Sequence, residues 1–246
     1  MSYLIVGASS GLGREIAYSF ARRKHNLILI ARDERDLSSI KSDLILKFNI
    51  DVEIISLDFS NIKEINNKLL FNKIVLKNLD GVLFPIGLMF EKDNAHLDEQ
   101  KINEIVNANF LSITFLISNL LENFNKKNYS IIGFGSVSGL LGRNINVYYA
   151  ASKRALESFF ESLGFENRYN NIKIQFYILG YLDTNLSFGQ KLALPKGNVK
   201  KLSEIIYANK EKKFLKLYYP FFWSLIGYIL KIMPTTIIIK LKNLIK

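Results

Sequence analysis

The sequence predicts an α/β protein with a doubly wound parallel sheet, and two observations carry that prediction. Short runs that are almost wholly apolar, such as 3–6 and 26–31, alternate with longer amphipathic segments along most of the chain. Runs without polar alternation are typical of strands that helices cover on both faces of a parallel sheet. The chain has 246 residues, of which 49% are hydrophobic, so it can bury one large core.

The expected elements alternate in chain order. We expect strands at 3–6, 26–31, 52–57, 80–84, 129–134, 172–179 and 214–218. We expect helices at 12–24, 33–48, 62–76, 97–124, 147–169 and 199–210, the second of them capped by Asp33. Right-handed crossovers join such strands into one Rossmann-type sheet, in which ligands bind beyond the carboxyl ends of the strands. Residues 1–218 are therefore expected to form one domain, followed by an apolar and basic tail at 219–246.

Composition limits the classes of function. The net charge is +11, but the basic residues are dispersed rather than striped, so we expect a general lysine bias and no nucleic-acid partner. The chain has no cysteine, which excludes disulfides, thiolate metal sites and a cysteine nucleophile. No group of His, Asp and Glu has metal-ligand spacing, so no metal is expected. The chain enters its first strand without a basic leader, which favours a cytoplasmic location.

A glycine-rich turn with GxxxGxG spacing lies between the first strand and the first helix. Glycines let a backbone turn tightly and approach a pyrophosphate, and a helix N-terminus supplies free N–H groups and a positive dipole end. A purely structural turn is the alternative, but the position in the first strand–helix unit favours binding of a dinucleotide. The residues expected to contact it are Gly7, Ser9, Ser10, Gly11, Leu12 and Gly13.

The end of the second strand indicates which dinucleotide binds. An acidic residue there would accept the ribose 2′-hydroxyl of NAD, whereas this chain has Ala31 followed by Arg32. A guanidinium suits bidentate contact with a 2′-phosphate, although an arginine at a strand end can also be merely solvated. We therefore expect NADP(H) as the cofactor in preference to NAD(H).

Four further positions complete a recognisable pattern. Tyr149 and Lys153 form a YxxxK motif on a predicted helix, Ser136 lies 13 residues before Tyr149, and Asn109 lies in the middle of the long predicted helix. With the glycine turn, these residues resemble the short-chain dehydrogenase/reductase (SDR) family over about residues 3–218. The resemblance implies a hydride-transferring oxidoreductase with Asn109, Ser136, Tyr149 and Lys153 as its catalytic group.

The resemblance also implies a role for each residue. Tyr149 would exchange a proton with the substrate oxygen, Ser136 would hydrogen-bond that oxygen, Lys153 would hold the nicotinamide ribose, and Asn109 would support a water that relays protons. Tyr149 and Lys153 share a helix face, so we expect the ammonium to lower the tyrosine pKa from about 10. Further cofactor contacts implied by the family are Asp58, Phe59, Gly87, Gly180 and Thr184, beside Tyr149 and Lys153 themselves.

The chain departs from the family at three places. Pro85-Ile86-Gly87 stands where the family usually has Asn-Ala-Gly, Val6 where threonine is common, and Leu179 where proline is usual. None of these positions carries the acid/base chemistry. The lost asparagine would remove a hydrogen bond that ties neighbouring strands together.

The substrate side is less determined. We expect an apolar pocket, and Arg143 is either an anchor for an acidic substrate group or a solvated loop residue. In the tail, 217–230 carries no charge but is 14 residues long, short of the ~20 that span a bilayer. The tail is expected to cover the pocket or a subunit interface, or to lie on a membrane surface beside its lysines. Candidate pocket residues are Leu140, Leu141, Tyr148, Tyr181, Leu186 and Phe188.

Taken together, the sequence predicts an NADP(H)-dependent oxidoreductase that interconverts a carbonyl and an alcohol. The substrate is expected to be a small apolar or lipid-linked molecule, and the protein a homodimer or homotetramer that pairs through its two long helices. It would be cytoplasmic, with peripheral contact at the inner face of a membrane. The alternative is a non-catalytic NADP-binding sensor or scaffold of the same fold; a sugar epimerase or dehydratase is disfavoured by the short region after the sixth strand.

Overall fold

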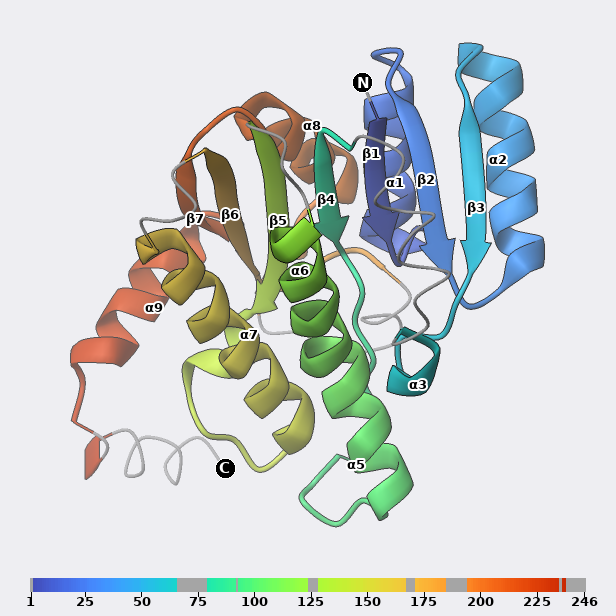
Figure 1. The fold of residues 1–246 in the computed structure, drawn as a ribbon. Helices are drawn as coiled ribbons and strands as arrows, with labels where there is room; N and C mark the ends of the chain where they lie inside the picture. Colours follow the sequence, from blue (N-terminus) through green and yellow to red (C-terminus); the bar gives the residue numbers. More distant parts are fainter. Residues whose placement is uncertain are drawn as a thin grey trace.

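A computed structural model of the chain describes residues 2–65, 79–91, 93–123, 128–166, 171–184, 194–234 and 236–237. Within these residues, seven parallel strands form one sheet in the order β3-β2-β1-β4-β5-β6-β7 (Figure 1). The predicted doubly wound sheet is confirmed. Its strands are β1 (Ser2–Val6), β2 (Asn26–Ala31), β3 (Val52–Ser56), β4 (Gly81–Phe84), β5 (Tyr129–Ser136), β6 (Ile172–Leu179) and β7 (Phe214–Tyr219).

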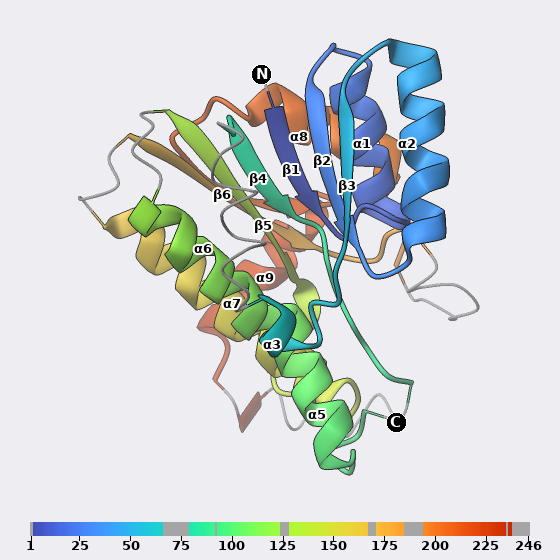
Figure 2. The same ribbon diagram turned by 45° about the vertical axis from the view of Figure 1, so that its right-hand side comes forward.

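Helices cover both faces of the sheet, as Figure 2 shows from the side. One face packs against α1 (Gly11–Ala21), α2 (Glu34–Phe48) and α8 (Val199–Asn209). The other packs against α6 (Ser112–Asn123), α7 (Val147–Phe165) and the short α3 (Ile62–Ile65). Strand β1 alternates between the two cores, with Ile5 in the first and Leu4 in the second, and both are fully buried. Burial on both faces is why its sequence lacks polar alternation.

The strand order reverses between β2 and β4, which both pair with β1. Crossovers on opposite faces leave a crevice at that point, beyond the carboxyl ends of the strands. In Figure 1 these ends are the lower edge of the sheet, where the arrowheads of β1 to β4 point. Every segment singled out from the sequence for chemistry follows the end of a strand or lies on a helix that reaches this edge.

The long helix predicted at 97–124 is interrupted. It consists of α5 (Glu99–Val106), a π-helical turn at Asn107–Leu111 and α6. Asp98 caps α5 by accepting a hydrogen bond of 2.8 Å from the backbone N–H of Lys101. A π turn inserts one residue into the helix and is often found at functional sites. Here it contains Asn109, whose side chain is fully buried.

Other predicted boundaries shift by a few residues. The first helix ends at Ala21 rather than at 24, and the helix predicted at 147–169 ends at Phe165. Strand β5 continues through Ser136 because it pairs with β6 along its whole length. The prediction that Asp33 caps the second helix is confirmed, since its side chain accepts from two backbone N–H groups. Most of the helix predicted at 62–76 lies outside the described residues.

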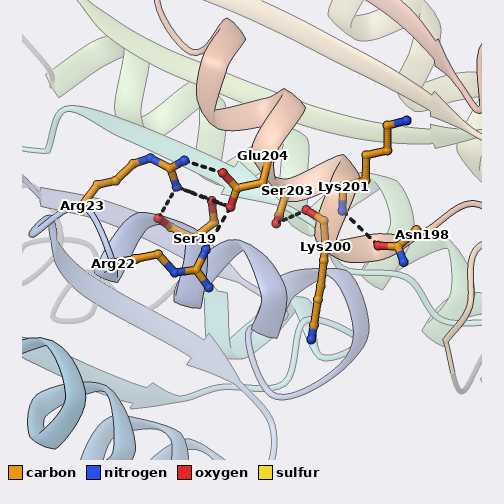
Figure 3. A network of polar contacts seen from close by, with 8 residues as sticks. All are labelled: Ser19, Arg22, Arg23, Asn198, Lys200, Lys201, Ser203 and Glu204. Atoms are coloured by element: carbon orange, nitrogen blue, oxygen red, sulfur yellow. Dashed lines mark hydrogen bonds and ion pairs between the residues drawn. The ribbon is translucent and has the colours of Figure 1, made fainter.

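Polar contacts fasten α8 to α1 at the edge remote from the crevice. Glu204 on α8 accepts hydrogen bonds from Ser19 (3.0 Å), Arg22 (3.2 Å) and Arg23 on and just after α1 (Figure 3). The arginines hold the pKa of the Glu204 carboxyl below its usual range. This cluster helps to orient α8 on the sheet. None of its residues lines the crevice.

The chain after β7 forms the apolar helix α9 (Phe222–Ile232). Trp223 is buried, whereas Phe221, Leu225, Tyr228 and Ile232 are between 65% and 82% exposed. Their spacing of three or four residues places them on one face of the helix. The outward face of this helix is therefore largely apolar, like the face that contains Trp223.

One helical stretch in the described part of the chain, Glu99–Glu122, is long and apolar enough to cross a membrane by length and composition alone. In the structure, 44% of its most apolar window is buried inside the protein. Its contacts are those of a core helix packed on the sheet.

Candidate active site

A cavity of about 770 Å³ opens at the carboxyl ends of the strands. It lies beside β1, at the point where doubly wound sheets bind ligands. Two of the predicted site residues, Gly13 and Asn109, lie outside the lining. The predicted residues that line it are Gly7, Ser9, Ser10, Gly11, Leu12, Arg32, Asp58, Phe59, Gly87, Ser136, Tyr149, Lys153, Gly180 and Thr184.

The glycine turn is built so closely that side chains could not replace its glycines. Gly7 has φ +91°, and a Cβ there would lie 2.9 Å from the Cα of Ile86. A Cβ on Gly13 would lie 2.0 Å from the carbonyl oxygen of Gly7, which is far inside van der Waals contact. Gly13 therefore shapes the turn from behind while the other residues face the cavity. Ser10 is the N-cap of α1 but its side chain makes no capping bond, so the first turn keeps N–H groups for an anion.

The end of β2 presents Arg32 to the cavity. Its side chain is 78% exposed, and its guanidinium is 4.0 Å from the carboxylate of Asp58, which follows β3. Asp58 is held in place by the backbone N–H and the hydroxyl of Ser60, at 2.9 Å and 2.7 Å. Such a long, exposed ion pair holds Arg32 only weakly. Arg32 can therefore turn to an incoming phosphate. Phe59 is 2% exposed and packs mainly into the core below.

Ser136 and Tyr149 meet at the cavity floor. Ser136 is the last residue of β5, and its hydroxyl accepts hydrogen bonds from the backbone N–H (3.2 Å) and the hydroxyl (2.8 Å) of Ser138. Tyr149, on the first turn of α7, lines the same cavity, and the Ser136 side chain is close enough to lower the pKa of its phenol. The structure thus places the two residues, 13 positions apart in the sequence, at one cavity, as the resemblance implies.

The pKa of Tyr149 differs from the sequence expectation. Burial raises the pKa of the phenol above its ordinary value, and this effect outweighs the hydrogen bond from Ser136 and the positive charge of Arg143, which both lower it. The Lys153 amine donates to two backbone carbonyl oxygens. The net lowering of the Tyr149 pKa expected from the sequence is therefore not found, because the effect of burial is larger.

Lys153 is buried behind the cavity floor, with 3% of its surface exposed. Its Nζ donates to the carbonyl oxygens of Ile86 (3.0 Å) and Phe134 (3.1 Å). Burial lowers the pKa of the Lys153 amine to about 8. A Cβ added at Gly87 would make an ordinary contact of 3.7 Å with this Nζ, so Gly87 lies directly beside the amine. Ile86, one of the departures from the family pattern, supplies its backbone carbonyl rather than its side chain.

Asn109 does not face the cavity; its neighbour Ala108 does. The Asn109 side chain accepts a hydrogen bond from the backbone N–H of Leu88 and donates one to the carbonyl of the same residue, both at 2.8 Å. Both halves of the amide are used, so the side chain ties the π turn to the segment after β4. Asn109 was expected beside the site, and its described hydrogen bonds hold two backbone segments together.

Asp93 belongs to the site and was missed from the sequence. It is 1% exposed, and its two carboxylate oxygens accept the backbone N–H groups of Tyr148 and Tyr149, each at 3.0 Å. The segment around it reads as an ordinary polar loop. Because the helix it contacts begins more than 50 residues later, no local pattern could have revealed the role.

The segment after β6 closes the cavity from the other side. A Cβ on Gly11 of the glycine turn would be 3.3 Å from the methyl group of Thr184. Gly180 is needed for a different reason, since a Cβ there would lie 2.0 Å from the indole nitrogen of Trp223. Trp223 is on α9 and also packs against Tyr181, with ring centroids 5.9 Å apart. The C-terminal helix therefore backs one wall of the cavity.

The family follows from a comparison with protein-family models. The model of the short chain dehydrogenases matches residues 2–192 of the chain. The chain belongs to this family. The match covers the glycine turn, the Ser136–Tyr149 pair and Lys153, which are the features that carry the resemblance in the sequence.

Curated relatives of this short-chain dehydrogenase are oxidoreductases by name. A very-long-chain 3-oxoacyl-CoA reductase from Vanderwaltozyma polyspora is 31% identical over 198 residues, which cover 74% of this chain and 55% of the relative. The chain thus spans about half the length of that reductase. A hydroxysteroid 11-beta-dehydrogenase 1-like protein B from Xenopus laevis is 28% identical over 233 residues, covering 92% of this chain and 80% of the relative.

Solved structures confirm the fold. A short-chain dehydrogenase from Sphingobium yanoikuyae in complex with NADPH has a TM-score of 0.80 to this chain, at 21% identity, and covers 95% of this chain and 96% of that chain. An alcohol dehydrogenase from Comamonas testosteroni described as specific for bulky-bulky ketones has a TM-score of 0.75 at 24% identity, covering 87% of this chain and 85% of that chain.

The substrate side of this dehydrogenase differs from the sequence expectation. Among the predicted pocket residues, Tyr181 lines the cavity, whereas Leu140, Leu141 and Tyr148 do not. Leu140 is buried in the 3-10 turn after β5, and the Tyr148 hydroxyl donates to the carbonyl of Ala95 at 3.4 Å. Leu186 and Phe188 lie outside the described residues. Apolar lining that the sequence did not reveal comes from Leu88, Met89, Val137 and Ile145, with Arg143 beside them.

No group of three or more His, Cys, Asp or Glu residues that could hold a metal occurs in the part of the chain that the structure describes. The polar side chains that line the cavity carry hydroxyls, an amine, guanidinium groups, the carboxamide of Asn146 and two carboxylates, Asp58 and Glu91. Such a set suits a nucleotide and a carbonyl substrate better than a cation.

Proposed function

We propose that this chain is an NADP(H)-dependent oxidoreductase that reduces a carbonyl group to an alcohol, or catalyses the reverse reaction, on an apolar or lipid-linked substrate. The observation that carries the proposal is that Ser136, Tyr149 and Lys153 line one cavity together with the glycine turn. A nucleotide-binding turn and a proton-donating pair in one cavity are what hydride transfer to a carbonyl requires.

The residues present fit a dinucleotide. The glycine turn leaves no room for side chains at Gly7 and Gly13, and the start of α1 has N–H groups that Ser10 does not cap. These features leave a concave, electropositive cradle of the kind that pyrophosphates occupy. When bound, NADPH would supply the hydride. The residues that would hold it are Gly7, Ser9, Ser10, Gly11, Leu12, Gly13, Arg32, Asp58, Phe59, Gly87, Tyr149, Lys153, Gly180 and Thr184.

The preference for NADP(H) rests on Arg32. Its guanidinium is exposed and only weakly paired with Asp58, and the residue before it is Ala31 rather than an acid. A 2′-phosphate would find a bidentate cation there and no carboxylate on β2 to repel it. Solved structures of similar fold, such as the NADPH complex described above, are consistent with this choice.

The chain's own residues can carry out the proton transfer in either direction. The Tyr149 hydroxyl would give its proton to a carbonyl oxygen in reduction and take one from the alcohol in oxidation. The Ser136 hydroxyl would donate a second hydrogen bond to the same oxygen and stabilise the negative charge that develops on it. Lys153 would contact the ribose through the donor that its two carbonyl partners leave free, and Asn109 would hold the π turn beside it.

The apolar lining of the cavity supports this class of substrate. Leu88, Met89 and Ile145 line the same cavity as Ser136 and Tyr149 and offer apolar contacts. The relatives named for very-long-chain 3-oxoacyl and steroid chemistry point in the same direction. We therefore propose a carbonyl compound with a long or bulky apolar part.

We further propose a cytoplasmic protein that lies against the inner face of a membrane and assembles as a homodimer or homotetramer. The exposed apolar face of α9 supports membrane contact, and no acidic residue follows Glu211 while seven lysines do. Leu111 and Phe115, exposed one turn apart on the long helix, support assembly through that helix.

The decisive experiment measures NADPH oxidation with three probe ketones: a long-chain 3-oxoacyl thioester, a steroid ketone and a bulky diaryl ketone. We expect turnover with at least one probe, and a loss of about 10²- to 10⁴-fold in kcat for Tyr149→Phe with NADPH binding retained. Tyr148→Phe is the matched control, because that neighbouring hydroxyl contacts the Ala95 carbonyl outside the cavity. Full activity in Tyr149→Phe would exclude the proposal.

A further inference from the structure

Asp93 holds the start of the helix that carries Tyr149 and Lys153. It is 1% exposed, and its Oδ1 and Oδ2 accept the backbone N–H groups of Tyr148 and Tyr149, both at 3.0 Å. Its own carbonyl oxygen accepts the N–H of Val147 at 3.3 Å. Asp93 therefore satisfies three consecutive N–H groups of the first turn of α7, groups that have no partner within a helix.

The residues next to α7 do not perform this function. Asn146 is the N-cap by position, but its backbone is left-handed (φ 53°, ψ 45°) and its side chain makes no capping bond. Elsewhere in the described chain, Asp33, Asp98 and Asn198 cap α2, α5 and α8 from the position directly before each helix. At α7 the cap comes instead from the segment after β4. The conformation of that distant segment therefore sets where the helix begins.

The segment after β4 also contacts Lys153 and Asn109, the other two predicted catalytic residues that lie on helices. The carbonyl of Ile86 accepts from Lys153 Nζ at 3.0 Å, and the backbone of Leu88 makes two hydrogen bonds of 2.8 Å to Asn109. Ile86, Leu88 and Asp93 thus fix Lys153, Asn109 and Tyr149, respectively, from one short stretch of chain. The first two contacts use backbone atoms, so Asp93 is the residue whose side chain can be tested.

We propose that Asp93 is a positioning residue for the reaction: its carboxylate clamps the first turn of α7 and thereby keeps the Tyr149 hydroxyl beside Ser136. This inference rests on the proposed function. Proton transfer needs the donor within hydrogen-bond reach of the substrate oxygen, and misplacement of a catalytic group by about 1 Å can cost about 10²-fold in rate. Without the clamp, the first turn of α7 would fray into the cavity, and Tyr149 would move with it.

The test compares Asp93→Ala and Asp93→Asn with Asp98→Ala. Asp98 is a matched control, because it caps α5 with the same chemistry (2.8 Å to the N–H of Lys101) on a helix segment without Tyr149 or Lys153. We expect Asp93→Ala to lower kcat about 10- to 100-fold with the probe ketones, while the Kd for NADPH changes less than about threefold. Asp98→Ala should keep kcat within about twofold. Asp93→Asn retains one acceptor and should recover part of the loss.

Two further outcomes keep the inference separate from the proposed function. If the wild-type protein reduces no probe, the proposed function fails, and amide hydrogen exchange decides on the clamp. Asp93→Ala should then speed exchange at Tyr148 and Tyr149 by about tenfold or more while Leu156 to Phe160 stay protected. If Asp93→Ala does not fold, Asp93→Asn provides the comparison with Asp98→Ala. The clamp is refuted if kcat in the Asp93 variants stays within about twofold of Asp98→Ala, or if exchange at the two tyrosine amides is unchanged.

Discussion

Replacement of Lys153 by methionine should change how the stability of the protein depends on pH. Lys153 is 3% exposed, and its Nζ has two described partners, both of them backbone carbonyl oxygens. A neutral amine can donate to both with its two hydrogens, whereas an ammonium has a third donor and a charge that burial penalises. Burial accordingly lowers the pKa of Lys153 from 10.5 to about 8. Methionine has a similar length and no charge to bury.

The sign and size of the effect follow from this pKa. Between about pH 8 and the ordinary value of 10.5, the unfolded chain binds one proton more than the folded protein at this position, so stability rises with pH. The burial cost is fully present below about pH 8 and amounts to about 3 kcal/mol, because each pKa unit corresponds to about 1.4 kcal/mol. From about pH 7.5 to about pH 9.5, roughly 2 kcal/mol of that cost should disappear.

The measurement is urea unfolding of the wild type and of Lys153→Met at about pH 7.5 and about pH 9.5. The difference in free energy of unfolding between the two proteins should shift by about 2 kcal/mol, with methionine relatively more stabilising at the lower pH. Other titrating groups cancel in this difference, including the buried tyrosines whose raised pKa values act at higher pH. Lys200→Met, on the exposed face of α8, controls for the loss of one positive charge.

A difference that does not depend on pH would refute the reasoning. It would mean that the folded protein accommodates the ammonium as well as water does, for example through solvent that reaches Nζ from the cavity. A shift of the opposite sign would mean that the charged form is the one the folded protein prefers. Either result would contradict the argument that burial lowers the pKa of Lys153 to about 8.

Two other predictions concern the cofactor and the tail. Arg32→Asp should reverse the order of affinity for NADPH and NADH in fluorescence titrations, because it places a carboxylate where the 2′-phosphate is expected; equal affinities in the wild type would contradict the NADP(H) proposal. Full-length protein should co-sediment with anionic liposomes, and Leu225→Glu with Ile232→Glu should weaken binding about 100-fold or more, since each exposed apolar side chain is worth about 1.5–3 kcal/mol on burial. Protein that ignores such liposomes would exclude membrane contact through α9.

The features predicted correctly from the sequence are those with a local cause. The strands of the sheet are apolar because helices cover both of its faces, and that pattern is visible in β1 and β2 without any knowledge of their partners. The glycine turn is equally local, since the close approach of Gly13 to Gly7 involves residues six positions apart. Ser136 and Tyr149 were expected at one site because their motif and spacing resemble those of the family, and in the structure both line one cavity.

The features that were missed or misjudged depend on contacts between distant segments. The π turn contains Asn109, whose side chain is hydrogen-bonded to Leu88, 21 residues away. Helical periodicity in the sequence cannot reveal such a contact. Tyr148 was expected in the pocket, but the clamp from Asp93 orients the first turn of α7 so that only Tyr149 faces inward. The division of the chain at residue 218 stays a prediction.

The sequence by itself determined the class of fold and the family, because the apolar runs, the glycine turn and the spaced motif residues each lie within short stretches. Only the tertiary structure decided the setting of the predicted site residues. Burial raises the pKa of Tyr149, two backbone carbonyls receive Lys153, and a carboxylate from the segment after β4 fixes the helix that carries both. The physical reason is that desolvation and hydrogen-bond geometry depend on which distant segments surround an atom, and those neighbours are defined only when the chain has folded.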